Sequence, residues 1–122
     1  MAYGVRAVEE ETGKPFSVSY HLVATGGASG DIPLYTPSSA NFKTNSIYVS
    51  FPAGTYSELE ISIRKGSNQV APGSGVYVGD SQVIEDRFKE TFVPGETVVL
   101  HYKNNNSSQT REAFVIVRGF LE

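Results

Sequence analysis

The sequence of 122 residues contains no cysteine. A disulfide framework, a thiolate metal site and a thiol nucleophile are therefore excluded, and the stability of the fold must come from packing. Histidine is also scarce, with two in the whole chain. A zinc site would need several ligands at close spacing, and neither histidine has an acidic or histidine neighbour two or four residues away.

Long apolar runs and basic runs are missing as well. No stretch approaches the ~20 apolar residues of a membrane-spanning helix, so we expect no membrane insertion. The formal net charge is -3 and the isoelectric point is about 5.4, which argues against a nucleic-acid partner. Acidic residues 9–11 stand where a signal peptide would have its apolar region, which indicates that the chain has no signal peptide.

Helical spacing of apolar residues is absent too, and short β-rich runs separated by Gly- and Pro-containing turns fill the chain. Residues 57–64 alternate clearly, with Leu59, Ile61 and Ile63 on one face and polar side chains on the other. The length and the turn spacing predict one all-β domain spanning residues 1–122, a sandwich of two antiparallel sheets with roughly eight to nine strands. The expected strands are residues 4–9, 16–25, 32–35, 42–51, 57–65, 75–79, 82–93, 97–103 and 112–121.

The alternation also predicts the core, because side chains of one parity share a face of a strand. Besides the set in residues 57–64, we expect inward-facing side chains along the second, fourth, sixth, seventh, eighth and ninth predicted strands. They are Phe16, Val18, Tyr20, Leu22, Ala24, Ile47, Val49, Phe51, Val76, Val78, Phe88, Phe92, Val98, Leu100, Val115 and Val117.

Catalytic motifs are not found. No G-x-S-x-G nucleophile elbow occurs, and the Gly-rich residues 26–31 lack the Gly-Lys-Ser/Thr ending of a phosphate-binding loop. We interpret His21 and His101 as surface or rim residues, and Asp80, Glu85 and Asp86 as a solvated edge, with a metal role as the alternative for both groups. A small hydrolase would require one histidine in a cleft beside a carboxylate.

Asparagine is concentrated at residues 104–106, in a polar loop between the last two predicted strands. Asn105 and Asn106 each begin an N-x-S glycosylation sequon. Asn and Ser are also common in tight turns, and turn chemistry is our preferred interpretation of this segment.

Several apolar side chains have the wrong parity for the core. Phe114, Ile116 and Phe120 alternate with inward residues of the last strand, and Tyr48 and Tyr77 also fall outside. A monomeric sandwich does not normally expose such a set, and aromatic residues are enriched at subunit interfaces. We therefore predict a subunit interface at Tyr48, Tyr77, Phe114, Ile116 and Phe120, with a covered central strand as the alternative.

The last 65 residues or so resemble the second half of a small jelly roll. Residues 59–70 (LEISIRKGSNQV) end a strand in a Lys-Gly turn, residues 94–102 (PGETVVLHY) begin with a Pro-Gly-Glu turn, and residues 114–122 (FVIVRGFLE) close on Gly-Phe-Leu. This turn placement is similar to the complement-head and tumour-necrosis-factor-like group, and to viral capsid, head-fibre and decoration proteins. The resemblance implies a jelly-roll-like β-sandwich that assembles symmetrically, with a trimer favoured.

The functional prediction is a non-enzymatic assembly module of a virus or phage particle, such as a capsid, decoration or spike protein. It implies a homo-oligomer that contacts other particle subunits, no cofactor, and a location in the virion after assembly in the host cytoplasm.

The alternative is a lectin-like β-sandwich, extracellular or on a cell surface, that binds a carbohydrate or a receptor. Loop aromatic residues would stack on sugar rings while carboxylates and amides bind the hydroxyls. The candidate ligand-binding residues are Asp31, Tyr35, Tyr56, Asn104, Asn105 and Asn106.

Overall fold

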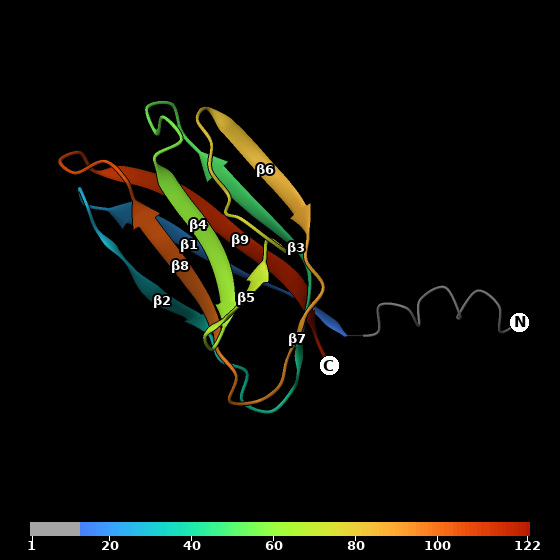
Figure 1. The fold of residues 1–122 in the computed structure, drawn as a ribbon. Helices are drawn as coiled ribbons and strands as arrows, with labels where there is room; N and C mark the ends of the chain where they lie inside the picture. The colour runs from blue at the N-terminus through green and yellow to red at the C-terminus, as the bar shows by residue number, and fades with distance from the viewer. Residues whose placement is uncertain (1–12) are drawn as a thin grey trace, which may run out of the picture.

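The computed structural model describes residues 13–122, which form nine β-strands (Figure 1). The predicted strand at residues 4–9 lies outside the described residues. Within these residues no helix is present, and so none that could cross a membrane. The strands are β1 (Lys14–Ala24), β2 (Ser29–Tyr35), β3 (Phe42–Phe51), β4 (Leu59–Lys65), β5 (Asn68–Ala71), β6 (Gln82–Arg87), β7 (Thr91–Phe92), β8 (Val98–Asn104) and β9 (Arg111–Leu121).

Two antiparallel sheets stack face to face, as predicted. The larger sheet has the order β1-β9-β3-β6, with the short β7 pairing with β3, and the smaller sheet has the order β2-β8-β4-β5. The chain passes from one sheet to the other at most connections. The first and last strands pair with each other, and Lys14 lies opposite Leu121. This crossing pattern over two antiparallel layers is that of a jelly roll, which confirms the predicted fold class.

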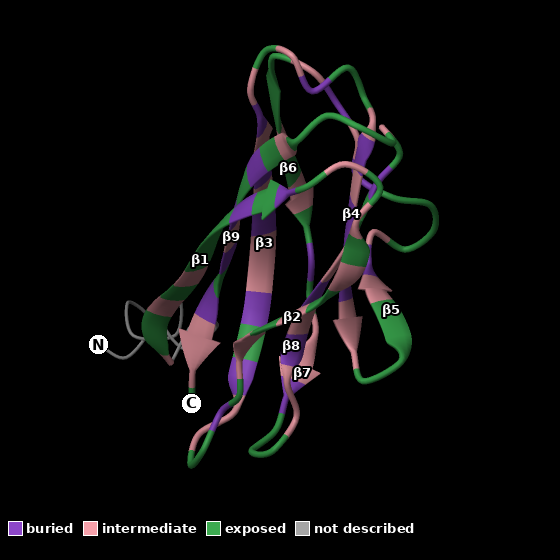
Figure 2. Ribbon diagram, turned by 90° about the vertical axis from the view of Figure 1, so that its left-hand side faces the viewer, coloured by how far each residue is buried: buried purple, intermediate pink, exposed green. Residues whose placement is uncertain are grey.

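The core fills the space between the sheets, and the buried segments in Figure 2 alternate along β3 and β9. The inner faces of both sheets contribute large apolar side chains that are at most 1% exposed. Most of the predicted core is confirmed, but Phe16, Val18 and Val78 are only partly buried, and Tyr20 and Val76 are 38% and 39% exposed. The largest fully buried side chains are Phe42, Phe51, Phe92, Leu22, Ile47, Leu59, Ile61, Ile63, Leu100, Val49, Val98 and Val115.

Two predicted strand boundaries are wrong. The long strand at residues 82–93 is two strands, because the hydroxyl of Thr44 donates to the carbonyl of Phe88 at 2.7 Å and accepts from the amide of Glu90 at 2.8 Å. The predicted strand at residues 75–79 is a single bridge between Tyr77 and Ile61. The sequence also missed β5, which pairs with β4 across a turn where Gly66 has a φ of 63°.

Candidate functional site

The outer face of the larger sheet carries the exposed apolar side chains of β9. Antiparallel pairing places Phe114 between His21 of β1 and Ser50 of β3. The Phe114 ring is 44% exposed and stacks on the imidazole of His21, with ring centroids 4.2 Å apart and planes 9° apart. An aromatic ring is thus held in a fixed orientation on a solvent-facing sheet.

The next row of the same face holds Ile116 beside Tyr48. The Tyr48 hydroxyl donates to a Glu85 carboxylate oxygen at 3.0 Å, and the guanidinium of Arg118 lies 4.9 Å from the ring centroid. Ile116 and Tyr48 are partly buried. We call Tyr48, Phe114 and Ile116 the outer-face patch: its centre is apolar and its rim is charged.

Phe120 lies further along β9 and is separate from this patch. Its cross-strand neighbours are Pro15 and Lys43, and it lines a hollow of about 500 Å³. Two lysines in this hollow are paired with carboxylates: Lys43 Nζ lies 2.6 Å from a Glu122 oxygen and Lys65 Nζ lies 2.7 Å from a Glu90 oxygen.

Tyr77 is not on an outer face, so its predicted exposure is wrong. It is 5% exposed, whereas its neighbour Val76 is 39% exposed, which reverses the predicted parity. Two backbone hydrogen bonds to Ile61 hold Tyr77 at 2.8 and 3.0 Å, and its hydroxyl donates to Asp86 at 2.9 Å. Burial first, and then Asp86, raise the pKa of the Tyr77 phenol well above its ordinary value.

The predicted ligand-binding residues separate into the two ends of the sandwich and one outer face. Tyr35 packs on Phe16 at one end of β1, with ring centroids 4.7 Å apart. Asn104 bonds to the Ala24 carbonyl at the other end of β1. Asp31 lies on the outer face of the smaller sheet, where its carboxylate is 2.6 Å from the imidazole of His101.

Asn104 is a structural residue rather than an accessible ligand-binding one. It is 2% exposed, and its amide nitrogen donates to the carbonyls of Ala24, Thr25 and Gln109 at 2.9–3.1 Å. Its side-chain oxygen accepts from the amide of Asn106 at 3.0 Å. The polar atoms of its side chain are thus bonded inside the protein, which speaks against the predicted role of Asn104 in ligand binding.

Tyr56, Asn105 and Asn106 do gather at one end, around a carboxylate that the sequence did not single out. Glu58 accepts from Asn106 Nδ2 at 3.2 Å and from Arg111 Nε at 3.0 Å. Tyr56 is 67% exposed, with the guanidinium of Arg111 5.5 Å from its ring centroid. We call Tyr56, Glu58, Asn105, Asn106 and Arg111 the Tyr56 cluster.

The backbone under Tyr56 is unusual. Tyr56 and Ser57 both have positive φ angles, of 53° and 55°, a region that side chains with a Cβ rarely occupy. Asp80 holds this loop, since one of its carboxylate oxygens accepts from the amides of Gly54 and Thr55 at 2.9 Å. The exposed ring is therefore presented by a fixed loop.

The Asn loop uses turn chemistry, as predicted. The side-chain oxygen of Asn106 accepts from the amides of Ser108 and Gln109 at 3.0 and 2.7 Å, and Asn105 Nδ2 donates to Glu60 at 2.8 Å. Glycosylation of either sequon stays an untested alternative.

Both histidines face carboxylates without forming a cleft. His21 Nε2 lies 3.5 Å from Glu112, and His101 lies beside Asp31. None of these four residues lines the hollow beside Phe120. In residues 13–122, no three His, Asp or Glu side chains are grouped so that they could hold a metal ion.

Comparison with known proteins places the fold among viral capsid structures. No profile of a known protein family and no curated sequence matches the chain. The cyanophage Pam1 capsid asymmetric unit contains a similar chain, with 13% identity over 90% of this chain and 86% of that one, at a TM-score of 0.56.

Two further capsid structures are similar. One is the acid-stable capsid of Helicobacter pylori bacteriophage KHP30 (15% identity, 86% of this chain, 92% of that chain, TM-score 0.51). The other is tomato aspermy virus (10% identity, 86% and 77%, TM-score 0.50). The chain thus has the jelly-roll fold found in phage and plant-virus capsids, which confirms the predicted resemblance at the level of the fold.

Proposed function

We propose that this chain is a non-enzymatic assembly module of a virus or phage particle, a capsid, decoration or spike component located in the virion. Its residues 1–122 act as one domain that forms a homo-oligomer, with a trimer favoured, and contacts other particle subunits. The fold shared with capsid structures supports this class, although a fold by itself does not define a function.

The observation that carries the proposal is the 44% exposure of Phe114 on a sheet face. When a partner covers a large aromatic ring on a flat face, the burial of apolar surface favours association. Because Phe114 is already held by stacking on His21, less side-chain entropy is lost when it is covered. The outer-face patch also has the anatomy of an interface, with an apolar centre and a polar rim at Glu85 and Arg118.

The test is the mass of the protein in solution, measured by analytical ultracentrifugation between about 1 and 100 µM. We expect an oligomer that Phe114→Ser shifts toward the monomer. Val93→Ser is the matched control, because Val93 is 43% exposed and lies on the loop after β7, outside the outer-face patch. A monomer at every concentration, or equal effects of the two substitutions, would refute the interface.

The second candidate function is carbohydrate or receptor binding by the Tyr56 cluster. Its support is specific: an aromatic ring that is 67% exposed stands beside amides and a carboxylate, the groups that bind sugar hydroxyls. Specific signals on a glycan array that Tyr56→Ala abolishes and Tyr20→Ala preserves would favour this function and an extracellular or cell-surface location.

A further inference from the structure

Besides the two-residue β7, four strands border the two sheets at residues 13–122, and three of them are protected against pairing with another chain. An edge strand presents unpaired backbone groups, which natural proteins shield with charges, proline, bulges or short length. β6 carries Glu85, Asp86 and Arg87, and β5 is four residues long. β2 contains Pro33, where its register with β8 shifts.

β1 carries these devices only at its first two residues. It is 11 residues long and has one hydrogen-bonded neighbour, β9, among the strands at residues 13–122. Lys14 and Pro15 stand at its start, and residues 16–24 contain neither proline nor a formal charge. A long uncharged edge of this kind is suited to pairing with a further strand.

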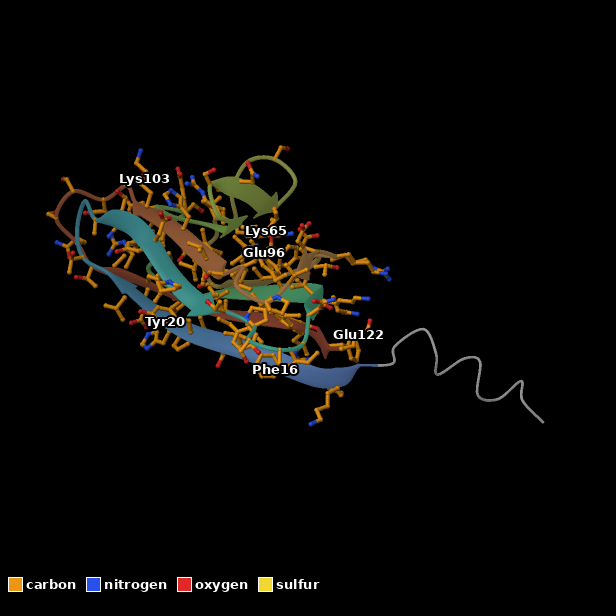
Figure 3. All side chains as sticks on the ribbon, turned by 90° about the horizontal axis from the view of Figure 1, so that it is seen from below. Phe16, Tyr20, Lys65, Glu96, Lys103 and Glu122 are labelled. Atoms are coloured by element: carbon orange, nitrogen blue, oxygen red, sulfur yellow. The ribbon has the colours of Figure 1, made fainter. Side chains whose placement is uncertain are left out.

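The side chains at this edge are incompletely covered on the core side. Leu22 and Ala24 are each 1% exposed, yet Tyr20 is 38% exposed and Val18 is only partly buried. Figure 3, in which Phe16 and Tyr20 are labelled, shows β1 at this margin of the sandwich. A partner strand beside β1 would therefore cover apolar surface as well as backbone groups.

We propose that β1 pairs antiparallel with β1 of a second copy of this chain, about a two-fold axis at Ser19. Ser19 is the middle residue of the strand, so this register gives the full overlap of Lys14–Ala24. A two-fold axis at Ser19 also places core-facing side chains of one copy opposite core-facing side chains of the other. If the register were shifted by one residue, core-facing side chains would lie opposite outward-facing ones.

The resulting pairs are chemically compatible. On the core side, Val18 meets Tyr20 of the second copy, and Phe16 meets Leu22. On the outer side, Ser17 meets His21, and Ser19 meets its own copy. No two formal charges of like sign lie opposite each other, a juxtaposition that would oppose pairing.

This contact is distinct from the outer-face patch. The axis runs perpendicular to the sheet, so both smaller sheets stay on the same side and the two larger sheets join edge to edge. The outer faces of the copies then form one continuous surface that carries two Phe114 rings.

Cysteine cross-linking tests the register, since the chain has no cysteine of its own. At the axis, Ser19→Cys places two Cα atoms about 4.5–5.5 Å apart, within the range of about 4.4–6.8 Å that a disulfide spans. With Ser17→Cys the two thiols lie four residues apart along the strands, about 13 Å, which a disulfide cannot bridge.

Under mild oxidation of about 10 µM protein, we expect Ser19→Cys to yield at least tenfold more covalent dimer than Ser17→Cys. Ser67→Cys, in the exposed turn between β4 and β5, reports random collision and should match Ser17→Cys. Equal cross-linking of the three variants would overturn the proposal.

A reversible measurement complements the covalent one. Ser19→Lys brings two ammonium groups together at the axis, and we expect it to weaken self-association at least tenfold, while Ser67→Lys leaves it unchanged. Both residues are exposed, so both variants should fold. If Phe114→Ser lowers the mass and Ser19→Lys does not, the outer-face interface stands and the β1 contact is refuted.

Discussion

Asn104 joins two loops at one end of the sandwich. Removing its side chain should lower the free energy of unfolding far more than removing the side chain of Asn105. Its amide nitrogen donates to three carbonyls and its oxygen accepts from one backbone amide. Asn104→Ala leaves these groups without a partner in a site that is 2% exposed. The affected segments are the end of β1 and the loop between β8 and β9.

The magnitude follows from the number of hydrogen bonds. The amide has two N–H donors and one acceptor in use, and each net hydrogen bond contributes about 1 kcal/mol. We expect Asn104→Ala to lower the free energy of unfolding by about 3 kcal/mol. For a domain of this size this corresponds to roughly 10 °C in the melting temperature.

Asn105→Ala is the matched control. Asn105 is exposed, and its amide nitrogen donates to the carboxylate of Glu60 in a solvent-exposed hydrogen bond. Surface interactions of this kind contribute about 0–1 kcal/mol.

The assay is urea unfolding followed by circular dichroism. With a slope of about 1.5–2 kcal/mol/M, Asn104→Ala should move the midpoint down by about 1.5–2 M, and Asn105→Ala by less than about 0.7 M. Similar midpoints for the two variants would show that Asn104 is not the structural anchor described above, and would restore its candidacy as a ligand-binding residue.

Two further predictions concern Tyr77 and Gly119. The raised pKa of Tyr77 means that the folded state holds the phenolic proton more tightly than the unfolded state, whose value is near 10. Stability is then complete below about pH 10 and falls above it by about 1.4 kcal/mol per pH unit. Unfolding curves at pH 8, 10 and 11 should show this slope, and Tyr77→Phe should reduce it. A Cβ on Gly119 would lie 2.1 Å from the carbonyl oxygen of Lys43, so Gly119→Ala should destabilise the domain by about 2–4 kcal/mol. Gly73→Ala, where a Cβ meets nothing within 4 Å, is its control, and equal melting temperatures would contradict the argument.

Local alternation predicted β3 and β4 because side-chain parity depends only on neighbouring residues. Ile47, Val49 and Phe51 are all at most 1% exposed. Parity failed at Val76 and Tyr77, where Gly75 has a φ of 78° and interrupts the extended backbone before them. β5 was missed because it is short and polar and is defined by its pairing with β4.

The candidate sites likewise divide into features that neighbouring residues predict and features that only the tertiary fold creates. The outward parity of Phe114 and Ile116 was correct because both lie within a regular strand. The burial of Asn104 had a signal that was overlooked, since it continues the inward series of Val98 and Leu100 at the end of β8. No local pattern could join Glu58 to Arg111, because only the tertiary fold brings them together.

The order of the strands has a consequence for how the chain folds. Among residues 13–122, only β4 and β5 pair as consecutive strands, and the remaining pairings join distant segments. Each of these pairings must close a long loop before it gains contacts, so we expect refolding on the millisecond-to-second scale. β9 lies between β1 and β3, so during synthesis β1 has no partner strand in the larger sheet until β9 is made. A nascent chain that ends before Arg111 can form only the part of this sheet that β3 makes with β6 and β7.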